Sequence, residues 1–125
     1  MGVYAGATAD ERRARRRERL LEAALDLAGR EGWQAAGVRA VCQRACLTPR
    51  YFYESFADRD ELLVAVFDAV SQEAAERVVA AVEAAPDDAP AKARAAVEAF
   101  VSLLEDDPRK ARVMFGEALG VPALE

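Results

Sequence analysis

The sequence contains no histidine and no isoleucine, and it has only two cysteines and one tryptophan in 125 residues. Without histidine, the commonest general base of enzymes is missing. The sequence also lacks a glycine-rich phosphate loop, a nucleophile elbow and a cluster of metal ligands. These absences predict that the chain is not an enzyme and that it carries no metal and no cofactor.

The two cysteines, Cys42 and Cys46, stand four residues apart. A zinc site needs four ligands, and no histidine is present to complete one. The pair is also too close in sequence to close a useful loop by a disulfide. We interpret both as small, buried, reduced packing residues; a redox sensor is the alternative.

Long apolar runs are missing as well. No stretch of about 18 apolar residues is present to span a membrane, and the N-terminus lacks the apolar segment of a signal peptide. The sequence therefore predicts a cytoplasmic protein that does not contact a membrane. Runs of Val, Ile and Thr, which favour strands, are also absent, whereas alanine is abundant and 53% of the residues are apolar.

What is present is helical spacing. Apolar residues recur three and four positions apart, with Gly or Pro at each break. This spacing predicts an all-α fold of six helices, at about 12–30, 38–45, 49–55, 59–85, 90–104 and 108–119. Gly29 and Gly32 mark the end of the first helix. The inward face of the fifth helix is predicted to carry Val97, Phe100, Val101 and Leu104.

Charge is distributed unevenly along the chain. The net charge is −5, but residues 1–50 carry ten Arg against six acids, whereas residues 51–125 carry seven basic residues against sixteen acids. Six of those Arg fall between positions 12 and 19. This asymmetry favours a polyanion as partner for the first part of the chain. The alternative is an ordinary solvated helix surface.

The two short helices are the most informative segment. A pair of short helices joined by a tight turn and supported by a longer helix is typical of a helix-turn-helix, whose second helix enters the major groove of DNA. The second of these two helices presents Thr48, Arg50, Tyr51 and Tyr53, whose guanidinium and hydroxyls suit base edges and phosphates. An aromatic-rich packing helix is the alternative.

The stretch from Arg17 to Val66 reads RERLLEAALDLAGREGWQAAGVRAVCQRACLTPRYFYESFADRDELLVAV. Its signals are L-x-x-A-L-x-L-A, the following G-W, V-R-x-V, a Tyr53-x-x-Phe56 pair and D-x-D-E-L. In this order the stretch resembles the N-terminal domain of the tetracycline-repressor (TetR) family of transcriptional regulators. The resemblance implies a flexible arm at 1–11, a three-helix helix-turn-helix DNA-binding domain at 12–58, and a long fourth helix opening a partial helical regulatory domain at 59–125.

The resemblance also implies roles for individual residues. Double-stranded DNA would be the partner, with Arg50 and Tyr51 facing bases, Pro49 opening the recognition helix, and phosphate contacts from Arg39, Thr48, Tyr53 and Arg59. Two positions depart from the family pattern, because Cys46 stands in the turn where glycine is usual and Arg50 replaces a position that is often glycine. The turn is therefore expected to be slightly strained or differently shaped.

The second half would hold an effector. The resemblance predicts a repressor released by a small apolar molecule, with a pocket formed by Phe67, Phe100, Met114 and Phe115; the alternative is that these residues are plain core. A homodimer is expected of the family, but its dimerisation helices would lie beyond Glu125, so we expect this chain to lack them. The competing function is a helical protein-interaction module that does not bind DNA.

Overall fold

The structure is a computed structural model that describes residues 8–116. Over this range the chain forms six α-helices and one short 3₁₀ turn, with no strand, which confirms the predicted all-α fold. The elements are α1 (Ala9–Glu31), η1 (Trp33–Ala35), α2 (Val38–Ala45), α3 (Pro49–Ser55), α4 (Arg59–Ala84), α5 (Ala89–Asp106) and α6 (Pro108–Phe115).

The first helix begins earlier than predicted, at Ala9, because Thr8 caps it. The Thr8 hydroxyl accepts a hydrogen bond from the Glu11 amide at 3.0 Å, and the Glu11 carboxylate accepts one from the Thr8 amide at 2.8 Å. This reciprocal pair satisfies two amide donors that a helix start leaves open. The prediction of a flexible arm over 1–11 was therefore wrong for residues 9–11, while residues 1–7 lie outside the described range.

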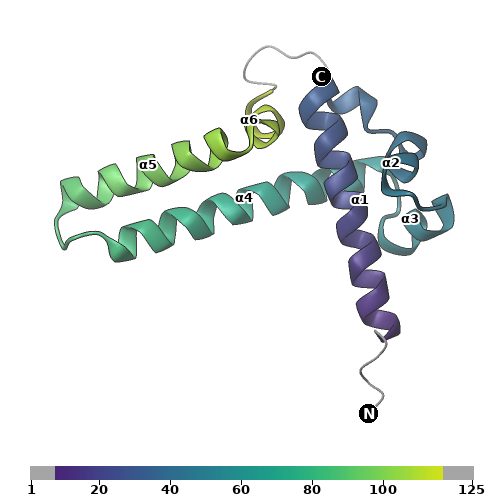
Figure 1. Ribbon diagram of the computed structural model, residues 1–125, viewed down its shortest axis with the longest axis horizontal. Helices are drawn as coiled ribbons and strands as arrows, with labels where there is room; N and C mark the ends of the chain where they lie inside the picture. The colour runs from purple at the N-terminus through teal and green to yellow at the C-terminus, as the bar shows by residue number, and fades with distance from the viewer. Residues whose placement is uncertain (1–7, 117–125) are drawn as a thin grey trace.

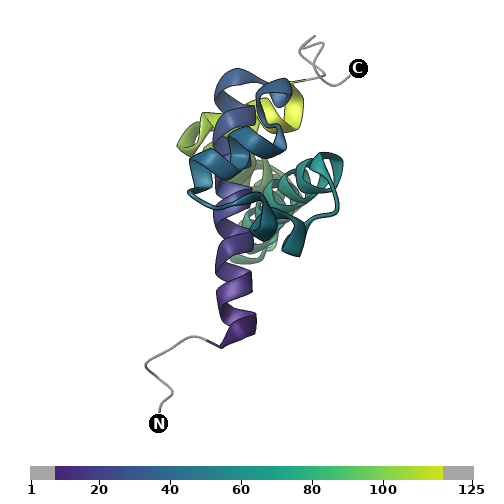
Figure 2. The ribbon, with the colours of Figure 1, turned by 90° about the vertical axis from the view of Figure 1, so that its right-hand side faces the viewer.

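The helix-turn-helix pair α2 and α3 packs against one side of α1, as Figure 2 shows with the pair in front of α1 and the α4–α5 hairpin behind it. The core beneath this pair is continuous. Leu20 of α1, Phe52 of α3 and Leu62 of α4 are completely buried, and Trp33 belongs to the same buried cluster. The first helices and the start of α4 therefore share one hydrophobic core.

Helices α4 and α5 form a long antiparallel hairpin that projects away from α1, and α6 returns to lie beside α1 (Figure 1). The contact of α6 is close. A Cβ atom added at Gly29 would lie 2.5 Å from the Arg109 Cβ and 2.8 Å from its Cα. Gly29 therefore lies inside α1 as the point of close approach for α6, and Gly32, with φ at 97°, ends the helix alone.

Two predictions of burial were wrong. On α5, Leu103 is the buried residue, whereas Val97 and Val101 are 62% and 44% exposed, because α5 turns the Leu103 side of the helix toward its neighbours. Of the two cysteines, Cys42 is buried as predicted, and its pKa is raised by that burial, but Cys46 is exposed in the turn after α2. Across the described residues, no helix has the length and apolar character needed to cross a membrane.

Candidate nucleic-acid interface

The turn between α2 and α3 is three residues long and is fixed by Cys46. Cys46 adopts the left-handed conformation (φ 59°, ψ 42°), and the next amide, that of Leu47, donates to the Cys42 carbonyl at 3.0 Å. A residue with a Cβ in this conformation costs about 1–2 kcal/mol, which glycine avoids. The strain expected from Cys46 at a glycine position is therefore present in the backbone.

The start of α3 is open to a ligand. Thr48 is the N-cap residue, with extended backbone angles, and Pro49 occupies the first turn, as predicted. The Thr48 side chain makes no capping hydrogen bond within the described residues, and Thr48, Pro49 and Arg50 are all exposed. The Thr48 hydroxyl is thus available at a helix start, where amide groups and the helix dipole favour an anion.

The outward side of α3 carries the predicted aromatic residues in two different settings. Tyr53 is 57% exposed, although its ring packs edge-on against Phe52 with centroids 5.0 Å apart. Tyr51 is half-buried beneath two guanidiniums, since the Cζ atoms of Arg16 and Arg50 lie 4.4 and 5.5 Å from the centroid of its ring. Tyr51 is therefore less accessible than Tyr53, and of the two arginines over its ring Arg50 is exposed whereas Arg16 is half-buried.

An arginine clamp from α1 fastens α3. The Nε and Nη2 atoms of Arg16 each donate to the carboxylate of Glu54 at 2.9 Å, and Arg13 approaches the same carboxylate at 3.6 Å. The hydrogen bond from Arg16 holds the pKa of Glu54 below its ordinary value. Such two-pronged pairs fix geometry as well as charge.

Two further arginines of α1 reach the helix-turn-helix. The Arg17 guanidinium lies 5.1 Å from the centroid of the Phe56 ring, and Arg19 donates to the Ala45 carbonyl at the end of α2. The basic run between 12 and 19 is therefore partly structural. Sequence reasoning missed these contacts, although Arg13, Arg16 and Arg17 are spaced three and four apart and share one helix face.

The remaining two residues that were predicted to contact phosphate, Arg39 and Arg59, differ in their exposure. Arg39 is exposed in the first turn of α2. Arg59 is half-buried, and its guanidinium donates to the carbonyls of Ala36, at 3.2 Å, and Trp33. Arg59 thus ties the start of α4 to the segment before α2, and two of its donors face into the protein.

A second charged cluster, which the sequence did not reveal, connects α6 to the helix-turn-helix through Asp26. Its carboxylate accepts hydrogen bonds from Arg30 of α1, Arg44 of α2 and Arg109 of α6. Arg109 also pairs with Glu22 and with Asp107, both at 2.7 Å. The hydrogen bond from Arg30 is the largest cause lowering the pKa of Asp26, and Arg109 lowers the pKa of Asp107.

These lowered pKa values predict an acid-sensitive fold. A carboxyl group whose pKa is lower in the folded than in the unfolded chain stabilises the fold above its ordinary pKa of 3.8 and loses that contribution as the pH falls through the folded value. We expect the melting temperature to be level near neutral pH and to fall below about pH 5.

Asp26→Asn should lower stability at pH 7 by about 1–2 kcal/mol and lose less on further acidification than the wild type. Asp68→Asn, on the exposed surface of α4, is the matched control and should change little at either pH. Thermal unfolding between pH 7 and pH 3 measures both. A variant at Asp26 with the full acid sensitivity of the wild type would contradict this role.

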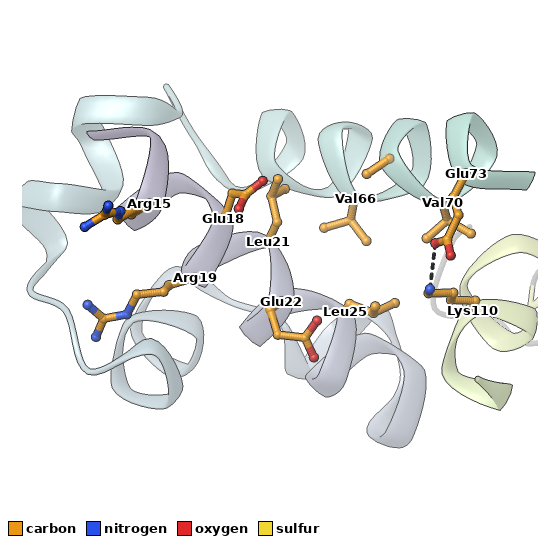
Figure 3. Close-up of a pocket in the computed structure, with 11 residues that line it drawn as sticks. Arg15, Glu18, Arg19, Leu21, Glu22, Leu25, Val66, Val70, Glu73 and Lys110 are labelled. Atoms are coloured by element: carbon orange, nitrogen blue, oxygen red, sulfur yellow. Dashed lines mark hydrogen bonds and ion pairs between the residues drawn. The ribbon is translucent and has the colours of Figure 1, made fainter. Parts of the chain in front are cut away.

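The structure also shows a groove between α1, α4 and α6, with a volume of about 670 Å³ (Figure 3). None of the four residues predicted to form an effector pocket lines it. Phe100 and Phe115 pack edge-on with centroids 6.0 Å apart, Phe67 is 42% exposed, and Met114 packs partly buried against the core. Among residues 8–116, no group of three or more acidic or cysteine side chains gathers as a metal site would require.

A helix-turn-helix whose second helix is exposed, followed by a helical body, is the fold of helix-turn-helix transcription regulators. Residues 20–66 match the family model described as bacterial regulatory proteins, tetR family. These residues therefore form a tetR-family domain, and the described chain has the all-α fold of that family's regulators.

Solved structures extend the likeness beyond that domain. A TetR family transcription regulator from Marinobacter aquaeolei VT8 superposes with a TM-score of 0.79 at 22% identity, over 90% of this chain and 60% of its own length. A putative tetR family regulator from Shewanella sp. PV-4 gives 0.74 at 23% identity, over 88% and 57%. A TetR-like regulator from Rhodococcus sp. RHA1 gives 0.73 at 20% identity, over 87% and 61%.

The chain thus spans about 60% of the length of these structures. No curated protein matches it by sequence.

Proposed function

We propose that the chain binds double-stranded DNA in a sequence-specific manner and regulates transcription. The observation that supports this best is the exposed α3, which presents Thr48, Arg50 and Tyr53 while Arg16 and Glu54 hold it against α1. A recognition helix that is already fastened loses little freedom when it enters a groove. The tetR-family domain at residues 20–66 supports the same function.

Each residue receives a proposed role. Arg50 and Tyr51 face base edges, Arg50 being the more accessible, and phosphate oxygens meet Arg39, Thr48 and Tyr53. Pro49 sets the first turn of α3. A phosphate contact by Arg59 would use the N–H groups left after its bonds to Trp33 and Ala36, since a guanidinium has five.

The finer parts of the proposal concern regulation. We divide the chain as predicted, into a DNA-binding part at 12–58 and a regulatory part at 59–125, and we propose a repressor released by a small effector. A homodimer would place two recognition helices about 34 Å apart on one face of DNA. The proposal assigns no catalytic role to any residue.

The experiment is to select DNA sequences from a random duplex library and to measure binding by mobility shift at several salt concentrations. The affinity is expected to fall steeply with salt, because phosphate contacts release counterions. Tyr53→Phe should weaken binding to all duplexes similarly, whereas Arg50→Ala should cost about 1–3 kcal/mol on the selected site and relax the preference at one or two base pairs.

Arg94→Ala, an exposed arginine on α5, is the matched control and should leave both the affinity and the preference unchanged. If the selection enriches no sequence and the wild type binds no duplex at low salt, the protein-interaction module becomes the better interpretation. A changed base preference in Tyr53→Phe but not in Arg50→Ala would reverse the two roles.

A further inference from the structure

The groove between α1, α4 and α6 has an apolar floor and a charged rim (Figure 3). Its floor combines two helices, with Leu21 and Leu25 from α1 and Val66, Ala69 and Val70 from α4. The volume of about 670 Å³ lies within the range of small-molecule sites. Because the floor of the groove is apolar, it favours a ligand with an apolar body.

The rim has an excess of positive charge at one end. Glu22 is paired with Arg109 at 2.7 Å, and Glu73 with Lys110 at 2.6 Å. Arg15, Glu18 and Arg19 line the other end, and among the described residues none of these three forms an ion pair. Figure 3 shows Arg15 and Arg19 together at one end of the groove, with Glu73 and Lys110 at the other.

We propose that this groove binds an amphipathic anion, such as a straight-chain carboxylate, and that its occupancy weakens DNA binding. The carboxylate of the ligand pairs with the guanidiniums of Arg15 and Arg19, which outnumber the single carboxylate of Glu18 at that end. The hydrocarbon tail of the ligand lies over Leu21, Val66 and Val70. This site replaces the predicted aromatic pocket as the effector site. The proposal has two halves. The regulatory half, that occupancy weakens DNA binding, rests on the proposed function, whereas the binding half, that the groove binds the anion, does not.

The coupling to DNA follows from what Arg19 already holds. Its guanidinium donates to the carbonyl of Ala45, the last residue of α2, at 2.5 Å. Only one N–H of Arg19 makes this bond, and a carboxylate in the groove draws the whole guanidinium toward itself and away from Ala45, which loosens the end of α2 from α1. The groove is also built from α1, α4 and α6, so a ligand wedged into it changes the spacing between α6 and the helix that carries the arginine clamp.

The binding half is tested without DNA, by calorimetry of the whole chain with dodecanoate and with dodecyltrimethylammonium, each below its micelle concentration. Dodecanoate is expected to bind one per chain and at least about tenfold more tightly than the cation. Arg15→Gln should weaken dodecanoate about tenfold, while Arg94→Gln on α5 should not.

A second pair of variants locates the site. Ala69→Trp places a large ring in the groove from an exposed position and should abolish binding, whereas Ala80→Trp, exposed farther along α4, should retain it. Circular dichroism melting checks that both variants are folded. Equal affinity for the two probes, or dodecanoate binding that Ala69→Trp leaves unchanged, would overturn the site.

The regulatory half uses the mobility shift with the selected duplex. Dodecanoate should lower the DNA affinity of the wild type and of Ala80→Trp, but not that of Ala69→Trp. Saturating dodecanoate with no change in DNA affinity overturns the regulatory half alone. A chain that binds dodecanoate in the groove and binds no duplex overturns the proposed function and leaves the site standing.

Discussion

Replacing Phe52 by alanine is expected to destabilise the protein by about 3–5 kcal/mol, which is a large part of the total stability of a domain of this size. Phe52 is completely buried and is the one buried residue of α3. Its ring packs against the rings of Tyr53 and Phe56, with centroids 5.0 and 5.6 Å apart. Removing it leaves a cavity beneath the recognition helix and removes the ring against which Tyr53 packs.

The matched control is the same substitution at Phe67, which is 42% exposed on α4 and should cost less than about 1 kcal/mol. Urea unfolding of both variants measures the difference. The DNA affinity of Phe52→Ala, measured on protein that is still folded, should also fall. If Phe52→Ala and Phe67→Ala proved equally mild, α3 would be held mainly by the arginine clamp and not by its core residue.

The fold was largely predictable because local rules decide it. Thr48 and Pro49 begin α3 as predicted, and Asp58 caps α4, its side chain accepting from the Glu61 amide at 2.9 Å. The starts of α3 and α4 were predictable for this reason. Thr8 begins α1 by the same capping rule, so the start of this helix was also within reach of the sequence.

What could not be predicted depends on contacts between distant residues. The spacing on α5 fits two faces, and the contact with α4 decides that Leu103 is buried while Val97 and Val101 stay exposed. Likewise, the basic run on α1 gave a count of charges but not their partners. Glu54 lies 38 positions from Arg16, and no local pattern connects them.

These long-range contacts of the arginines change how the charged surface is to be understood. Arg16 is occupied by Glu54 and Arg19 by the Ala45 carbonyl, so they mainly position the helix-turn-helix. Arg15, Arg39 and Arg50 remain exposed and unpaired with carboxylates within the described residues. The acidic half of the chain also meets α1 directly, since Asp107 orients Arg109 toward Asp26. Charge asymmetry along the sequence therefore overstates the separation of charge in the folded protein.

The second large effect is expected at Gly29. Gly29→Ala should destabilise the protein by about 1–3 kcal/mol, because its Cβ would lie 2.5 Å from the Cβ and 2.8 Å from the Cα of Arg109. The carbonyl oxygen of Arg109, at 2.9 Å, blocks the same space, so most of the obstruction is backbone that only a shift of α6 can relieve. That shift would stretch the bond from Arg112 to the Gly29 carbonyl, now 3.0 Å, and the pairs of Arg109 with Glu22 and Asp26.

Gly37→Ala is the control, because nothing lies within 4 Å of a Cβ at Gly37 and its φ of −77° suits any residue. It should cost less than about 1 kcal/mol, since it changes only an N-cap position. Hydrogen exchange should show faster exchange of α6 amides in Gly29→Ala and unchanged rates in Gly37→Ala. Because Asp26 also holds Arg44 of α2, the Gly29 variant should bind DNA more weakly than the control. If Gly29→Ala lost stability while the exchange rates of the α6 amides stayed unchanged, the clash would be relieved within α1. The contact between Gly29 and Arg109 would then not couple α6 to the helix-turn-helix.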